Sequence, residues 1–390
     1  MKRVPLEELL EQIIDHRGKT PKKLGTDFTL SGVPVASAQL VTGGVLDLTD
    51  ARCVDEGTWR RWMPVPLEEG DVLLTSEAPL GRVAWVKDGA PLVLGQRLFA
   101  LRAAKNVTDS RYLGYWLSSA EGQASLGAHA TGSTVSGIRQ SALRKVQVPV
   151  RDLDAQRAIG EVLGALDDKI AANRAAAHAA RDLAVAVVST SSNLVKLGDV
   201  VRIVRKSMNP SALDLEVVKH FSLPAFDAGA ATIDSPSSIK STKNLLQEPV
   251  VLVSKLNPRI PRIWAVDRLP AELVLASTEF IALAPIGIGI GAVWASLLDP
   301  RFTQSVLERT AGTTGSHQRV KPEQMLDIEV RDVRELAVEQ RELVESLCRK
   351  VNAVADEKQL LASTRDELLP LLMSGRITIK DAEKTVEEVV

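Results

Sequence analysis

Two loop segments carry cations in a setting that suits contacts with a polyanion. The first spans residues 15–23, where Arg17 and Lys19 stand beside Thr20 and Gly18 and Pro21 shape the turn. Guanidinium and ammonium groups beside a hydroxyl suit phosphate oxygens and the edge of guanine. A solvated surface turn is the alternative interpretation of this segment.

The second segment spans residues 239–262 and holds five cations against one anion, Glu248. Its last part, residues 255–262, contains Pro258 and Pro261, which argues against a helix and favours a stiffened loop that displays its cations. The five cations are Lys240, Lys243, Lys255, Arg259 and Arg262.

Two Gln-Arg pairs are further candidates, because Gln can read adenine and Arg can read guanine through paired hydrogen bonds. Gln96-Arg97 directly precedes a predicted strand, so an architectural role is an open alternative. Gln318-Arg319 follows the glycine-rich segment 312–316, whose backbone amides could reach a phosphate. Residues 131–134 are its counterpart earlier in the chain, where capping of a helix over 139–145 is an alternative.

Motifs typical of enzymes are absent or incomplete. The chain lacks an Asp-Pro-Pro-Tyr-like tetrapeptide, and the glycines of residues 287–292 have the wrong spacing for a dinucleotide loop, which favours a packed element. Gly18-Lys19-Thr20 lacks the upstream glycine of a phosphate loop, and no Gly-x-Ser-x-Gly elbow occurs. The five histidines show no metal-ligand spacing. We therefore expect no catalysis, ATP use or metal site in this chain.

The elements that position these residues belong to a unit that occurs twice in the sequence. Thr131-Gly132-Ser133 and Thr314-Gly315-Ser316 are 183 residues apart, and Gln156-Arg157 and Gln340-Arg341 are 184 apart. A period this long indicates duplication of a whole domain rather than a solenoid. Such a chain would present two similar surfaces.

Short apolar runs predict the strands of both copies, and a helix predicted over 111–117 makes the class mixed α/β. The predicted strands are 33–36, 71–76, 83–86, 92–101, 250–254, 263–266, 273–283 and 326–330.

A long helix follows each copy. Apolar residues step by three and four from Ile159 to Val187 and again from Val344 to Leu368, which is typical of a coiled-coil seam. Each helix has about 35 residues and measures roughly 50 Å. Asn173, Lys358 and Arg365 interrupt the seams, as polar residues that fix register do. Pro370 is expected to end or kink the second helix, and Gly375 is placed as a stop signal. Two unrelated amphipathic helices remain an alternative.

Composition sets further limits. The 390 residues include 48 Lys plus Arg and 49 Asp plus Glu, a formal net charge of −1, so any nucleic-acid site must be local. Two distant cysteines argue against a disulfide framework. The charged N-terminal segment and the absence of a long apolar run predict no membrane contact and a cytoplasmic protein.

The order of several motifs resembles the specificity subunit of Type I DNA restriction-modification systems over nearly the full length. In the first half these are Arg17-Gly18-Lys19-Thr20-Pro21, Glu69 to Thr75 followed by Pro79-Leu80-Gly81, and Thr131 to Ile138 leading to Val148-Pro149 and Gln156-Arg157. In the second half they are Ser254 to Arg259, Ser277 to Phe280 and Gly312 to Val320. One departure is that the second half has Val204-Arg205-Lys206-Ser207 in place of the Arg-Gly-Lys-Thr-Pro motif.

The resemblance implies two α/β target-recognition domains, residues 1–150 and 194–332, separated by two long antiparallel coiled-coil helices, residues 151–193 and 333–379, in a pseudo-twofold repeat. An acidic tail, residues 380–390, would follow. The implied function is noncatalytic reading of a bipartite, asymmetric target on double-stranded DNA.

The resemblance also implies the partners, which are two adenine methyltransferase subunits and restriction/translocase subunits. S-adenosylmethionine, ATP and Mg are expected only in those partners, and no cofactor is expected in this chain. The alternatives are a coiled-coil structural adaptor without DNA contact, or the specificity subunit of a related methyltransferase or nuclease system.

From the loops and the resemblance together we predict twenty DNA-contacting residues. They are Arg17, Lys19, Thr20, Lys22, Gln96, Arg97, Thr131, Ser133, Thr134, Arg205, Lys206, Lys255, Asn257, Arg259, Arg262, Thr314, Ser316, His317, Gln318 and Arg319.

Overall fold

A computed structural model describes residues 2–132, 135–310 and 318–390. The chain forms two compact units. Unit 1 comprises Met1–Asp168 and Ala362–Val390, and unit 2 comprises Lys169–Leu361. Unit 1 is therefore assembled from both ends of the chain. The division passes through both long helices, so the bounds predicted for recognition domains and helical spacers remain predictions.

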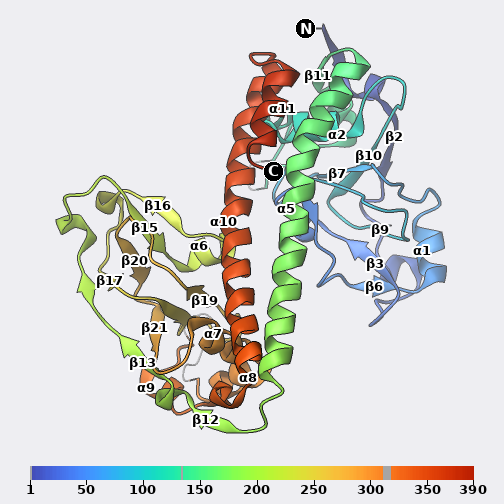
Figure 1. The fold of residues 1–390 in the computed structure, drawn as a ribbon. Helices are drawn as coiled ribbons and strands as arrows, with labels where there is room; N and C mark the ends of the chain where they lie inside the picture. Colours follow the sequence, from blue (N-terminus) through green and yellow to red (C-terminus); the bar gives the residue numbers. More distant parts are fainter. Residues whose placement is uncertain (1, 133–134, 311–317) are drawn as a thin grey trace. The chain divides into compact units, whose positions relative to one another are not determined.

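Unit 1 is built on a four-stranded antiparallel sheet with the strand order β2-β10-β7-β8 (Figure 1). These strands are β2 (Leu10–Asp15), β10 (Leu98–Ala103), β7 (Val72–Thr75) and β8 (Val83–Trp85). Every residue of β7 is buried, as expected for a continuous apolar run inside a sheet. At one end of the sheet, Asp71 and Arg102 form a buried ion pair with two hydrogen bonds of 2.9 and 2.8 Å.

The helices of unit 1 begin where capping residues stand. At the start of α2 (Ser110–Ser118), the Asp109 side chain accepts a hydrogen bond from the Tyr112 amide. At the start of α3 (Ala120–Ala128), the Ser119 side chain accepts one from the Gly122 amide. Buried Gln156 accepts hydrogen bonds from Thr108 Oγ1 and the Asp109 amide, and donates to two carbonyls. The repeated Gln-Arg motif thus has an architectural role in this copy.

Unit 2 contains a sheet of the same design, β13-β21-β18-β19, again antiparallel throughout. Its strands are β13 (Val201–Val204), β21 (Phe280–Pro285), β18 (Val250–Ser254) and β19 (Ile263–Val266). A two-stranded ribbon accompanies each sheet: β1 (Lys2–Pro5) with β11 (Gln147–Val150) in unit 1, and β12 (Leu194–Lys196) with β22 (Glu329–Arg331) in unit 2. The matching strand orders agree with the duplication predicted from the sequence.

The units differ in a second sheet. Unit 1 has three short strands, β6 (Cys53–Val54), β3 (Val33–Ala36) and β9 (Val93–Leu94). Unit 2 has five, in the order β14 (Ser207–Met208), β17 (Lys243–Leu246), β20 (Val274–Ser277), β15 (Val218–Phe221) and β16 (Thr232–Asp234). Similar frames therefore carry different attached sheets.

The remaining elements are short. In unit 1 they are β4 (Val41–Thr42), β5 (Val45–Leu46), α1 (Glu56–Trp62) and α4 (Gln140–Leu143). In unit 2 they are α6 (Leu223–Ala228), α7 (Ile290–Leu298), α8 (Pro300–Glu308) and α9 (Pro322–Leu326).

The two long helices are α5 (Leu153–Val188) and α10 (Val338–Ser374), and the predicted seam positions on both are buried or half-buried. Within unit 1 they run antiparallel, as Arg151 donates to the Leu372 carbonyl and Arg365 to Asp167. Within unit 2 they do the same, as Lys169 meets Glu357 and Thr190 meets Gln340. The predicted mixed α/β class with two long helices is confirmed.

The prediction that Pro370 ends the second helix early is wrong, whereas a kink at Pro370 stays a prediction. Helix α10 continues through Pro370 to Ser374, and Gly375 follows with a left-handed φ of 74°. Proline removes its own amide hydrogen bond, but buried Leu368, Leu372 and Met373 hold the last turns in place.

The predicted acidic tail contains a further helix, α11 (Ile379–Glu387). Thr378 and Asp381 form a capping box at its start, and Ala382 and Val386 are buried. Its apolar residues, four apart on one face, were a signal that the charge of the segment obscured.

Candidate nucleic-acid interface

In unit 1 the fold brings the two predicted loops together at the end of the four-stranded sheet. A cavity of about 530 Å³ is lined by Asp15, Arg17 and Gly18 from one loop, by Gln96 and Arg97 from the other, and by the turn of Ser76 and Glu77. A second cavity of about 640 Å³ includes Lys19, Thr20 and Lys22 together with Gln96 and Arg97. We call these lining residues the unit 1 loop cluster.

The cations of this cluster differ in how many contacts they already make with other groups of the protein. Arg17 forms paired hydrogen bonds with Asp15, donates to the Ile138 carbonyl and lies 4.1 Å over the Phe99 ring. Lys19 donates to the Trp62 carbonyl at 2.8 Å. Arg97 meets Glu77 at 3.2 Å, and about half of its side chain is exposed. Lys22 is exposed, so it is the cation of this set best placed to meet a phosphate.

Sequence reasoning missed two exposed residues that line the larger cavity, Gln39 and Arg52. The guanidinium of Arg52 stacks on the Phe28 ring at 3.8 Å, a contact that holds its charge at the cavity wall. Neither residue lies in a charged run or a motif, so only the folded chain reveals them.

Gly137 and Ile138 lie against the turn of Ser76 and Glu77. Thr131 pairs with Gly137, and the Ile138 amide donates to the Ser76 carbonyl at 2.9 Å. Thr131 is exposed at this edge of the cluster. The predicted Ser133 and Thr134 lie outside the described residues.

Unit 2 builds the corresponding cluster with the same backbone connections. The Lys255 amide donates to the Glu279 carbonyl, and the Val320 amide donates to the Lys255 carbonyl. In unit 1 the Ser76 amide donates to Arg97 and the Ile138 amide to Ser76. The loop after β7 in unit 1 and the loop after β18 in unit 2 therefore have equivalent neighbours. One neighbour is the residue just before the central strand β10 or β21, and the other is the segment of Ile138 or Val320.

The predicted residues of this unit 2 loop cluster come together in part. The Asn257 amide donates to the Gln318 carbonyl, and Arg319 is 3.3 Å from Glu279. Arg259 is exposed on the loop. The predicted Thr314, Ser316 and His317 lie outside the described residues.

Two cations of the basic segment turn inward. Arg262 forms paired hydrogen bonds of 2.6 and 2.7 Å with Asp227, and its side chain is 11% exposed. This pairing raises the pKa of Arg262 through its hydrogen bonds with Asp227. Buried Lys243 donates to the carbonyl and hydroxyl oxygens of Ser241. The local charge excess in the sequence therefore overstates the charge that this loop displays.

Arg205 and Lys206 lie just after the end of β13, and Arg17 lies just after the end of β2. Both are exposed, and they contact Glu323 and Gln247 respectively. Because β2 and β13 occupy equivalent edge positions in their sheets, these residues take the place of the missing Arg-Gly-Lys-Thr-Pro motif.

The glycine-rich residues 287–292 form a packed helix start, as the sequence favoured. Glu345 places its carboxylate at the N-terminus of α7 and accepts hydrogen bonds from the Gly291 and Ala292 amides at 2.9 and 3.0 Å. A side chain of the protein itself thus satisfies the amides that a nucleotide phosphate would otherwise meet.

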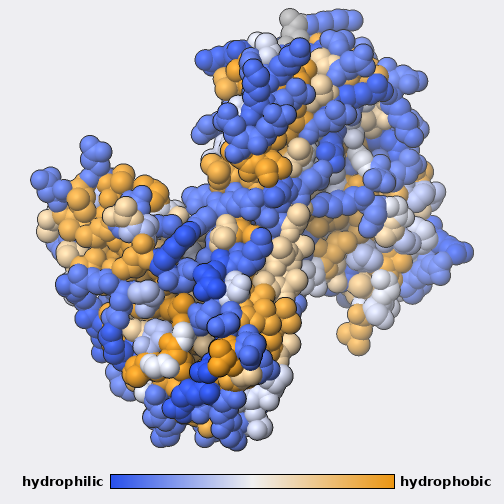
Figure 2. Space-filling model, in the orientation of Figure 1, coloured by the Kyte–Doolittle hydropathy of each residue, from blue (hydrophilic) through white to orange (hydrophobic). Residues whose placement is uncertain are grey.

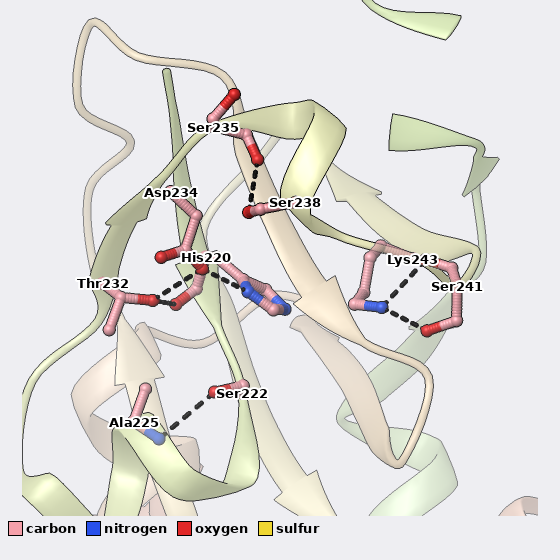
Figure 3. A network of polar contacts seen from close by, with 9 residues as sticks. All are labelled: His220, Ser222, Ala225, Thr232, Asp234, Ser235, Ser238, Ser241 and Lys243. Atoms are coloured by element: carbon pink, nitrogen blue, oxygen red, sulfur yellow. Dashed lines mark hydrogen bonds and ion pairs between the residues drawn. The ribbon is translucent and has the colours of Figure 1, made fainter. Parts of the chain in front are cut away.

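A polar network lies on the five-stranded sheet (Figure 3). His220 Nδ1 is 2.8 Å from Asp234 Oδ2, and Thr232 donates to the same oxygen. These residues tie β15 to β16. Within the described part of the chain, no three His, Cys, Asp or Glu side chains gather in a way that could hold a metal ion.

Apolar side chains reach the surface near β15 and β16, as Figure 2 shows for this face. Leu215, Val217 and Ile233 are each about half exposed. This apolar surface carries no cation cluster among the described residues, so we place the candidate interface at the two loop clusters instead.

Comparison with known families identifies the first part of the chain. Residues 1–177 match a family model described as the Type I restriction modification DNA specificity domain. These residues are thus similar to the DNA specificity domain of that family. The resemblance predicted from the motifs of the first half is thereby confirmed. No curated protein matches the chain.

One solved structure supports the fold beyond the matched residues. The S subunit of a Type-I restriction-modification system from M. genitalium is 15% identical, with a TM-score of 0.55 over 95% of this chain and 94% of that one. The HsdS subunit from Thermoanaerobacter tengcongensis is 14% identical over 96% and 97% of the two chains, but its TM-score of 0.35 adds nothing to the fold argument.

None of the described helices combines the length and the apolar character that crossing a membrane requires.

Proposed function

We propose that the chain is the noncatalytic specificity subunit of a Type I restriction-modification complex and reads a bipartite, asymmetric target on double-stranded DNA. One loop cluster would read each half of the target. The observation that carries this proposal is the recurrence of one four-stranded frame, with equivalent loop connections, in both units. Since the attached sheets and the loop residues differ, the two half-targets should differ as well.

Lys22, Arg52 and Arg259 are exposed and form no ion pair with a described residue, so they would make the first contacts with phosphates. Arg97, Arg205, Lys206 and Arg319 are also exposed, but each would exchange a partner side chain, Glu77, Glu323, Gln247 or Glu279, for a phosphate. Gln39, Gln96 and Gln318 line or adjoin the same loops and can read base edges. Arg17, Lys19 and Arg262 are bonded to neighbouring groups of the protein, so we assign them to positioning the loops.

The proposed partners are two adenine methyltransferase subunits and the restriction/translocase subunits. S-adenosylmethionine, ATP and Mg would be bound by those partners. A complex of this kind that modifies chromosomal DNA would work in the cytoplasm. We propose α5 and α10 as the docking surface for the methyltransferase subunits, because a long helical pair offers an extended, stiff surface.

The decisive experiment exchanges one recognition domain. The chain is co-expressed with a cognate methyltransferase subunit, and methylated adenines are mapped across the genome. We expect a split, asymmetric motif. Replacing residues 1–150 with the equivalent segment of a relative should change one half of the motif and leave the other half intact.

A matched chimera with residues 194–332 exchanged should change only the other half. A change of both halves in either chimera, or of neither half in both, would contradict modular reading. If methylation continues unaltered when the subunit is omitted, the chain is not the specificity subunit, and the adaptor alternative is favoured.

A further inference from the structure

A cavity of about 360 Å³ within unit 2 lies outside both loop clusters. Its walls come from α5, α10, α6 and β19, and the side chains that matter most are Asn173, Arg174, Arg181, Phe226, Trp264 and Lys358. Two of these, Asn173 and Lys358, are polar residues that interrupt the apolar seams of the long helices. A volume of this size is at the lower end of the range for small-ligand sites.

The cavity gathers cations without matching anions. Arg174, Arg181 and Lys358 line it, and none of the three forms an ion pair with any residue that the structure describes. Asp227 is the one acidic group in this lining, and its carboxylate is taken by the paired hydrogen bonds of Arg262. The local charge is therefore positive and uncompensated.

Burial makes this arrangement unfavourable for the protein alone. Desolvation lowers the pKa of Lys358, and the neighbouring charges of Arg174 and Arg181 lower it further. Desolvation also lowers the pKa of Arg181, and its Nε atom is buried without a hydrogen-bond partner among the described groups. Arg174 is exposed, but Arg181 and Lys358 are partly withdrawn from water beside it, and like charges in this setting indicate a missing anion.

A buried amide supplies an independent sign of a ligand. Asn173 is 7% exposed and lines the cavity, yet its Nδ2 atom has no hydrogen-bond partner in the described chain. Buried polar groups in native proteins nearly always have a partner. Amide, guanidinium and ammonium groups all donate, so the missing partner must be rich in acceptors and carry negative charge.

We propose that this cavity binds a phosphate group carried by a small ligand. Phosphate matches the site better than a single carboxylate does, because it offers more acceptor oxygens and a charge approaching −2 to three cations. The half-buried rings of Phe226 and Trp264 form an apolar wall beside the cations, which suits a ligand with a flat organic part. The same cations and amide would recognise a free phosphate or a nucleoside phosphate, so the experiment below distinguishes these two sources.

The test is calorimetric titration of the full chain with pyrophosphate and, separately, with adenosine diphosphate, at constant ionic strength. We expect saturable binding of at least one of them. Lys358→Met should weaken it by about tenfold or more, since it removes a buried, charge-assisted hydrogen bond to the ligand. Asn173→Leu should weaken it as well. Lys350→Met, on an exposed position of the same helix, is the matched control and should bind like the wild type.

Thermal unfolding of the same variants separates binding from folding. Without ligand, Lys358→Met should unfold at the same or a higher temperature than the wild type, because it relieves like-charge repulsion. The ligand should raise the unfolding temperature of the wild type and of Lys350→Met, and at the same ligand concentration this rise should be smaller in Lys358→Met.

The two arms also identify the source of the phosphate. Tighter binding of adenosine diphosphate, reduced by Trp264→Leu, assigns a nucleoside phosphate, whereas equal binding assigns free phosphate. The proposal fails if neither ligand binds the wild type, or if Lys358→Met and Lys350→Met bind equally well. It also fails if Lys358→Met weakens only binding to duplex DNA, which would assign the cavity to the DNA backbone.

Discussion

At the scale of single residues, the loop clusters combine bonded cations with freely displayed ones. Arg17 and Arg262 are each held by a carboxylate in two hydrogen bonds, which fixes the guanidinium but reduces its attraction for another anion. Lys22, Arg52 and Arg259 are exposed and form no ion pair with a described residue. Electrostatic attraction of DNA should depend on the second group.

This distinction predicts a pattern in the salt dependence of DNA binding by the full chain with its methyltransferase partner. Changing Lys22, Arg52 or Arg259 to Ala should reduce the slope of log K against log salt by about 0.9 for each phosphate that is no longer neutralised. Fluorescence anisotropy with a labelled duplex at several salt concentrations provides the measurement.

Arg60→Ala is the matched control, because Arg60 is equally exposed but pairs with Glu56 on α1, away from both cavities. Its slope should equal that of the wild type. Unchanged slopes for all three test variants would remove these residues from the interface.

The sequence could predict which loops form the site but not which side chains within them stay available. The Asp15 partner of Arg17 is two residues away, whereas the Asp227 partner of Arg262 is 35 residues away. Likewise, Phe28 meets Arg52 because their neighbours Thr29 and Cys53 pair. Long-range pairing of this kind has no local signal, so burial of Arg262 and display of Arg52 require the fold.

At the scale of elements, helix ends show how one segment stabilises another. The Glu345 carboxylate on α10 meets the first amides of α7, where the helix dipole favours negative charge. The sequence of α7 could not predict that Glu345 accepts from its amides, because Glu345 lies more than fifty residues later in the chain. The period of the apolar residues, by contrast, predicted the long helices themselves.

We predict that Glu345→Ala destabilises unit 2 by about 1 to 3 kcal/mol, because two buried amides lose their acceptor. Hydrogen exchange at the Gly291 and Ala292 amides should rise, and chemical denaturation should show the decrease in stability. Glu342→Ala, an exposed carboxylate on the same helix, should have a much smaller effect. Equal effects of the two substitutions would show that the Glu345 carboxylate does not stabilise α7.

At the scale of the whole molecule, the first unit depends on both ends of the chain. The N-terminal strand β1 pairs with β11, and the last part of α10 packs along the first part of α5 through Arg365 and Asp167. Tyr115 donates to the same Asp167 carboxylate at 2.6 Å, so the sheet domain of unit 1 is joined to this pair of helices.

A chain truncated after Leu361 should therefore lose stability selectively. We expect limited proteolysis and hydrogen exchange to show opening of unit 1, including the segment around Tyr115, while the sheet of unit 2 stays protected. The full-length Arg365→Met variant is a smaller change, and it should increase hydrogen exchange in the same segment. Equal protection of unit 1 in truncated and full-length chains would contradict the assignment of residues 362–390 to this unit.

The way each frame is threaded has a consequence for how new specificities could arise. In unit 1 the chain leaves the sheet after β2 and returns at β7, and in unit 2 it leaves after β13 and returns at β18. In each sheet these two strands flank the same central strand, β10 or β21. A foreign stretch spliced between them would need to match these two attachment points and to pair with one later strand of the second sheet, β9 in unit 1 or β20 in unit 2. The scaffold could thus accept grafts of very different length while its hydrophobic centre is kept.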